Sequence, residues 1–161
     1  MDVLLLALLT TLNALFAMSE MALSTSRRAR LAALAETGDT GAEAALRLME
    51  EPTHFLSTVQ IGITSIGMLS GIVGEAAFAA PLAVWMENLG MGRGTASVVS
   101  TAVVVTGITF FTIIFGELVP KRIGQLYPEP VARWVSRPMR SLAKGAKPFV
   151  CEKNRRFNRE H

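Results

Sequence analysis

The sequence contains little charge, few aromatic residues and almost no cysteine. Of its 161 residues, 18% are charged and 7% are aromatic, whereas 50% are hydrophobic and the mean hydropathy is +0.38. A soluble domain usually carries about 25% charged residues, so this composition favours a membrane protein. The one cysteine, Cys151, excludes a disulfide framework within the chain.

Several motifs of soluble enzymes are also missing from the sequence. It has no Cys/His cluster, no glycine-rich phosphate loop and no nucleophile beside a base. We therefore expect neither an enzyme nor a protein that binds nucleic acid. The first apolar run lacks a basic segment before it and a small-residue cleavage site after it, so we expect a retained span and not a signal peptide.

Three long apolar stretches dominate the chain, at residues 3–23, 55–86 and 95–121. About 20 apolar residues suffice to cross a bilayer. The second stretch would span about 48 Å as one straight helix, more than a hydrocarbon core of about 30 Å. We therefore expect it to break into a crossing over residues 56–73 and a re-entrant or interfacial helix that runs to Trp85. The predicted fold is an all-α integral membrane protein with three transmembrane helices, the second of them broken.

Shorter helices are predicted outside the spans. Residues 26–51 read as two short helices joined by a turn at residues 38–41. Residues 131–142 read as an amphipathic helix on the membrane surface, with Trp134 at the interface and a kink at Pro138. We assign residues 1–145 to a transmembrane domain and residues 146–161 to a basic linker or tail.

The distribution of Lys and Arg predicts the orientation in the membrane. Four lie in residues 24–54, one in residues 87–94 and eleven in residues 116–161. Positive residues concentrate on the cytoplasmic side. Three crossings of the plasma membrane with the N-terminus outside and the C-terminus in the cytoplasm satisfy this rule.

Glu117, at the end of the third apolar stretch, is the leading candidate for a functional residue. A carboxylate inside a span is costly unless it has a function or a partner. Pro120 has no N–H, so an α-helix here leaves the carbonyl of Gly116 without its normal donor. Carboxylate and carbonyl oxygens are ligands that hard cations such as Mg²⁺ and Na⁺ prefer. The alternative is an ion pair between Glu117 and Lys121, four residues on, which would anchor the end of the span.

Other polar residues of the first two spans are candidates for the same site. In the first span, Ser19 and Ser24 could supply hydroxyl ligands, or serve in helix packing and capping, and Glu20 could pair with Arg27 or Arg28. In the second span, Gln60 and Thr64 share a helix face. The serines of this span that could act as ligands are Ser65 and Ser70.

Three segments together resemble a known family. They are residues 16–23 (FAMSEMAL), 59–64 (VQIGIT) and 115–121 (FGELVPK). In this order and with these gaps they resemble the transmembrane domain of the CorC/cyclin M family, also called hemolysin-like. Some members carry asparagines where this chain has Ile61 to Ser65, which leaves the ligands from the second span open.

The resemblance implies magnesium efflux, coupled to sodium entry by alternating access. It also implies a homodimer embedded in membrane lipid, and a cytoplasmic pair of CBS domains that this chain does not contain. A second interpretation is a non-transporting membrane anchor or ion sensor for such cytoplasmic modules. The name hemolysin-like adds a membrane-lysing toxin as a third.

Overall fold

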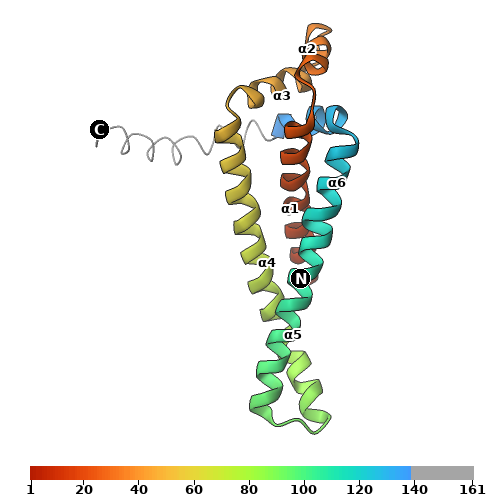
Figure 1. Cartoon of the computed structure of the whole chain (residues 1–161). Coiled ribbons are helices and arrows are strands. Elements are labelled where there is room, and N and C mark those ends of the chain that lie inside the picture. The colour runs from red at the N-terminus through yellow and green to blue at the C-terminus, as the bar shows by residue number, and fades with distance from the viewer. Residues whose placement is uncertain (139–161) are drawn as a thin grey trace, which may run out of the picture. The chain divides into compact units, whose positions relative to one another are not determined.

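The computed structural model describes residues 1–138, which are helical nearly throughout and contain no strand. Cys151, the predicted tail and the part of the predicted amphipathic helix after Pro138 lie outside the described residues. Figure 1 shows the order of the elements. They are α1 (Asp2–Thr25), α2 (Arg28–Glu36), α3 (Thr40–Glu50), α4 (Pro52–Asn88), α5 (Arg93–Ile113), the π-helical turn η1 (Ile114–Leu118) and α6 (Val119–Leu126). Residues 128–138 form a further helix.

Three helices are long and apolar enough to cross a membrane, which confirms the predicted all-α membrane fold. They are α1, α4 and the continuous helical stretch Arg93–Leu126. Within the most apolar part of each, only 22%, 17% and 11% of residues are buried inside the chain. Apolar side chains such as Phe110 and Leu118 therefore lie exposed and need lipid or another protein to cover them.

The predicted break in the second apolar stretch is wrong. Helix α4 runs without interruption through 37 residues and includes Pro81. A break would leave backbone N–H and C=O groups without partners in hydrocarbon, which costs more than accommodating one proline inside a helix. At about 1.5 Å per residue, α4 is about 56 Å long. It must therefore tilt or extend beyond a hydrocarbon core of about 30 Å.

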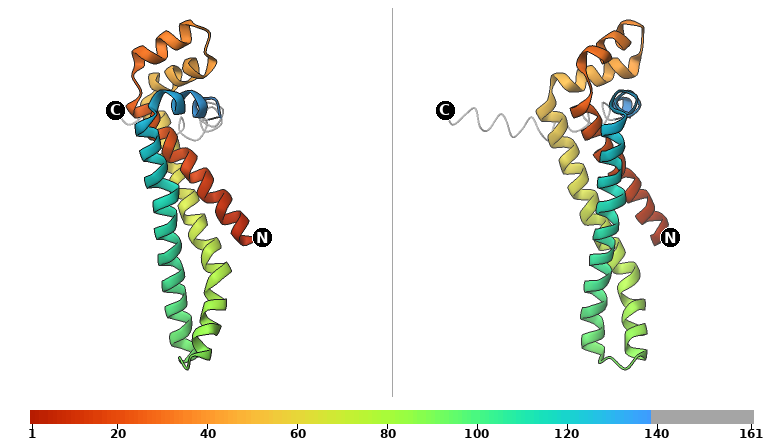
Figure 2. Two further views of the ribbon diagram at one scale, coloured as in Figure 1. Left: turned by 90° about the vertical axis from the view of Figure 1, so that its right-hand side faces the viewer. Right: turned by 45° about the vertical axis from the view of Figure 1, so that its right-hand side comes forward.

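The chain divides into two compact units. Unit 1 comprises Met1–Leu15 and Gly62–Pro120, and unit 2 comprises Phe16–Ile61 together with the residues from Lys121 onward. In unit 1 the second half of α4 lies antiparallel beside α5, as Figures 1 and 2 both show. The turn between them contains Gly90 at a φ of +94°, a conformation that side chains with a Cβ rarely adopt.

Unit 2 contains the predicted pair of short helices, α2 and α3. Gly38 turns the chain between them at a φ of +90°. Asp39 caps α3 by accepting hydrogen bonds from the N–H groups of Gly41 and Ala42 at 2.8 and 3.0 Å, and its carboxylate also pairs with Arg133. These hydrogen bonds, that of the Ala42 N–H first, lower the pKa of Asp39 below its usual value. The pair between Asp39 and Arg133 joins the helix of residues 128–138 to the start of α3.

The helix of residues 128–138 is amphipathic, as predicted. Ala132 and Val135 are buried, whereas Trp134 is 66% exposed. Exposure of an indole next to a membrane span is typical of residues at the lipid headgroups. The position of Trp134 at the membrane interface stays a prediction.

Candidate functional site

The backbone around Gly116 departs from α-helical geometry. Residues Ile114–Leu118 form a π-helical turn, in which the N–H of Val119 donates to the carbonyl of Ile114 five residues earlier. The next residue, Pro120, has no N–H to offer to Gly116. Short π-helical turns inside α-helices are frequent at functional sites. The sequence predicts a disturbed carbonyl at Gly116 but does not reveal the π turn.

The carbonyl of Gly116 has a partner from a helix far away in the sequence. The side-chain amide of Asn13, on α1, donates to this oxygen at 3.2 Å. A Cβ at position 116 would lie only 3.0 Å from that amide nitrogen. A side chain at position 116 would therefore push the amide of Asn13 back by a few tenths of an ångström, and glycine permits the close approach.

Asn13 is buried, and its amide is satisfied at one end only. The side chain is 3% exposed, and Oδ1 has no hydrogen-bond partner among the described residues. A buried polar atom left without a partner costs about 1–3 kcal/mol. Sequence reasoning missed Asn13 as a site residue. The available signal was a lone amide within the apolar run of residues 3–23.

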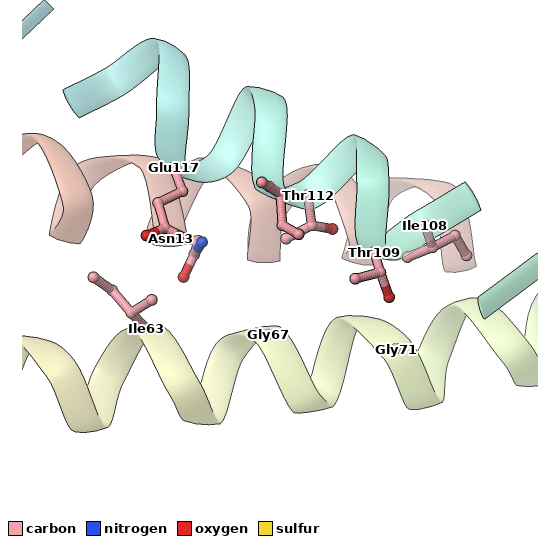
Figure 3. Close-up of a pocket in the computed structure, with 9 residues that line it drawn as sticks. Asn13, Ile63, Gly67, Gly71, Ile108, Thr109, Thr112 and Glu117 are labelled. Atoms are coloured by element: carbon pink, nitrogen blue, oxygen red, sulfur yellow. The ribbon is translucent and has the colours of Figure 1, made fainter. Parts of the chain in front are cut away.

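Asn13 and Glu117 open into a cavity of about 170 Å³ that lies wholly within unit 1. Figure 3 shows both side chains directed into the space between α5 and α4, with the amide oxygen of Asn13 pointing toward α4. At about 30 Å³ per water molecule, the cavity has room for about five waters. Its lining consists of Asn13, Ile63, Gly67, Gly71, Ile108, Thr109, Thr112, Ile113 and Glu117.

The glycines of α4 differ in their surroundings. A Cβ at Gly67 or Gly71 would meet no atom within 4 Å, because both residues line the cavity. At Gly74, by contrast, a Cβ would lie 1.9 Å from Cδ1 of Ile108 on α5. Gly74 therefore allows the two helices to approach, whereas Gly67 and Gly71 leave space for the cavity.

The predicted serine ligands do not line this cavity. Ser70 is buried, and its hydroxyl has no partner among the described residues, whereas Ser65 is exposed. Ser19 and Ser24 belong to unit 2. The hydroxyl of Ser19 donates to the carbonyl of Phe16 at 2.7 Å within its own helix, and Ser24 is exposed. Cation binding by these serines stays a prediction.

Two further polar candidates come from the second span. Gln60 and Thr64 are both exposed on α4 and do not line the cavity. Their expected place on a shared helix face follows from the four-residue spacing alone. A functional role for either residue stays a prediction.

Glu20 and Lys121 form an ion pair in unit 2. Their charged atoms lie 3.6 Å apart, and the side chains are 25% and 28% exposed. The expected partners of Glu20, Arg27 and Arg28, are therefore wrong, and Arg28 instead lies 4.0 Å from Glu50. The pairing depends on tertiary structure, because α6 runs close beside α1. A Cβ at Gly124 of α6 would lie 2.8 Å from the carbonyl oxygen of Met18.

The three apolar helices, and the cavity with a carboxylate among them, define a multi-pass helical membrane protein. The sequence profile described as the cyclin M transmembrane N-terminal domain matches residues 3–159. The chain belongs to this family.

Related proteins share the same region. UPF0053 protein sll0260 of Synechocystis sp. is 41% identical over 109 residues, 68% of this chain and 24% of the relative. A polyamine export protein of Escherichia coli is 35% identical, and one of Salmonella typhimurium is 33% identical, each with the same coverage. The chain spans about a quarter of the length of these curated relatives.

Proposed function

We propose that this chain is the membrane domain of a cation exporter, with the cavity beside Glu117 as its binding site. The observation that carries the proposal is that Glu117 and the amide oxygen of Asn13, which has no partner among the described residues, line the same cavity between apolar helices. Intramembrane carboxylates generally mark ion or substrate pathways. Transporter sites commonly lie where a membrane helix is irregular, as η1 is here.

Magnesium is the first candidate for the transported ion, as the family resemblance implies. Mg²⁺ keeps several of its waters and binds through one or two carboxylates. One carboxylate, one amide oxygen and room for about five waters suit that requirement. No group of three or more His, Cys, Asp or Glu residues within residues 1–138 could hold a metal, so water would complete the coordination. Sodium would occupy the same polar cavity on the return stroke.

Polyamines are the second candidate, supported by the names of the relatives from Escherichia coli and Salmonella typhimurium. Among the residues that line the cavity, Glu117 alone is ionisable. Its carboxylate could accept hydrogen bonds from one ammonium group. The apolar wall of Ile63, Ile108 and Ile113 could contact the methylene groups that follow.

The remaining parts of the proposal concern the whole protein. The exporter would lie in the plasma membrane with its N-terminus outside, would act as a homodimer and would carry CBS domains on its cytoplasmic side. The exposed apolar faces of the spanning helices provide surface for both lipid and a second copy. The alternative is a non-transporting anchor or sensor, in which the same polar residues only hold the helices together.

Flux measurements on Glu117→Gln test the proposal. The protein is reconstituted in liposomes, and the flux of Mg²⁺ and of spermidine is followed in parallel, with and without a sodium gradient. We expect Glu117→Gln to abolish flux, because it removes the cavity's only ionisable group and changes little in size. Glu75→Gln is the matched control, since Glu75 lies on α4 but does not line the cavity.

The outcomes separate the alternatives. Flux of one cation only would identify the substrate. Wild-type flux in Glu117→Gln would remove Glu117 from the mechanism. No flux of either cation in the wild-type protein would favour the anchor.

A further inference from the structure

The two ends of the Asn13 amide have different surroundings, and this determines its orientation. The nitrogen donates to the carbonyl of Gly116 at 3.2 Å. A carbonyl oxygen only accepts hydrogen bonds, so the reversed amide would place two acceptors against each other. The nitrogen is therefore held at Gly116, and Oδ1 is left on the side of the cavity, where it has no partner among the described residues.

We infer that Asn13 is a cation-binding and selectivity-determining residue: Oδ1 of Asn13 binds the cation together with Glu117, and the Gly116 carbonyl holds the amide in that orientation. This inference rests on the proposed function. It makes α1, the first span, the source of a second ligand for the cation. Asn13 and Glu117 line the same cavity and belong to the same unit.

A purely structural role for Asn13 does not account for its oxygen. An asparagine that only joined α1 to the π turn would need its N–H group alone, and a packing role would leave no buried acceptor unsatisfied. Without any partner this oxygen would cost about 1–3 kcal/mol, so it needs a water or a cation in the cavity that it lines. A cation that enters the cavity takes the place of water at this oxygen. Residues that bind ligands often carry such a cost in the empty protein.

The neutrality of Asn13 limits the charge of the site. Glu117 contributes one negative charge, and the other lining residues contribute none. One negative charge balances a sodium ion, or the one ammonium group of a polyamine that enters the cavity. A divalent ion keeps an excess positive charge there and must retain more water. A second carboxylate at position 13 would therefore shift the site toward divalent ions.

Binding measurements on variants of Asn13 test the inference. The purified protein is titrated with magnesium chloride and, separately, with spermidine hydrochloride at constant ionic strength, and binding is read as the rise in thermal unfolding temperature. We expect Asn13→Leu to weaken binding of either cation about tenfold or more, as loss of a hydrogen bond or ligand to a charged group does. We expect Asn13→Asp to raise the preference for Mg²⁺ over spermidine about tenfold.

Thr11→Val is the matched control. Thr11 lies on the same helix, is exposed, and donates to the carbonyl of Ala7 at 2.7 Å, so its replacement removes a hydroxyl without touching the cavity. Its binding should equal that of the wild-type protein. A general loss in Thr11→Val as well would assign the effect to disturbance of α1 and would overturn the inference.

The results distinguish this inference from the proposed function. If Glu117→Gln abolishes binding but Asn13→Leu binds like the wild-type protein, the cavity binds cations without Asn13 and the inference is refuted. If the wild-type protein responds to neither cation, the proposed function fails, and the inference fails with it. Should Asn13→Leu not fold, an unchanged ratio of Mg²⁺ to spermidine affinity in Asn13→Asp refutes the inference by itself.

Discussion

Alanine at Gly74 and at Gly71 should have opposite effects on the stability of the α4–α5 pair. A Cβ at Gly74 would lie 1.9 Å from Cδ1 of Ile108, and 3.2 and 3.3 Å from its Cγ1 and Cγ2. Rotation of the terminal methyl relieves the first contact only. One turn away on the same helix, a Cβ at Gly71 would meet nothing within 4 Å.

The magnitudes follow from two terms. Replacing glycine by alanine inside a helix stabilises it by about 0.5–1 kcal/mol at either position. Overpacking a tight contact costs about 1–3 kcal/mol, and it applies to Gly74 only. We therefore expect Gly71→Ala to be stabilising by up to about 1 kcal/mol and Gly74→Ala to be less stable than Gly71→Ala by about 1–3 kcal/mol.

Unfolding of both variants in mixed micelles with increasing dodecyl sulfate gives the two free energies, with circular dichroism as the probe. The comparison between variants cancels the helix-propensity term and isolates the contact with Ile108. Equal stabilities within about 0.5 kcal/mol, the usual error of such differences, would refute the close approach of α4 and α5 at Gly74.

Two further predictions concern unit 2. The pKa of Asp39 is lowered from 3.8 by the hydrogen bonds from Ala42 and Arg133, so its stabilising effect is complete above about pH 4 and disappears as the pH falls through the lower, folded-state pKa. Asparagine also caps helices well, so Asp39→Asn should lose this part of the pH dependence of the thermal unfolding temperature. A wild-type pH profile in Asp39→Asn would contradict it. In Gly124→Ala, the new Cβ would lie 2.8 Å from the carbonyl oxygen of Met18 and 3.2 Å from the amide nitrogen of Ala22. These backbone atoms cannot rotate away, and the same micelle titration should show a loss of about 1–3 kcal/mol. Unchanged stability would mean that α6 does not contact α1 at this point.

The fold class could be predicted from the sequence because it depends on residues that are close together along the chain. The three apolar stretches identify the spans, and the turn predicted at residues 38–41 marks the boundary between α2 and α3. The break predicted in α4 was wrong because excess length does not require a break: a continuous helix keeps its backbone groups paired and can tilt or extend beyond the bilayer.

The candidate site could be predicted only in part. Glu117, Gly116 and Pro120 stand next to each other in the sequence, so local reasoning identifies a carboxylate beside a disturbed carbonyl. Asn13 is 103 residues from Gly116, and nothing in the sequence pairs the two. The same holds for Lys121 and Glu20, whose pairing depends on α6 lying beside α1.

The sequence by itself determined that the chain is helical, that it crosses a membrane and that it holds one costly carboxylate at the end of its last span. Hydrophobic length and backbone hydrogen bonding decide these properties residue by residue along the chain. Only the tertiary structure decided which polar atoms share the cavity with Glu117. That depends on which helix faces meet, and helix faces are brought together by packing at positions such as Gly74 and Gly116, where the absence of a side chain sets the distance between helices.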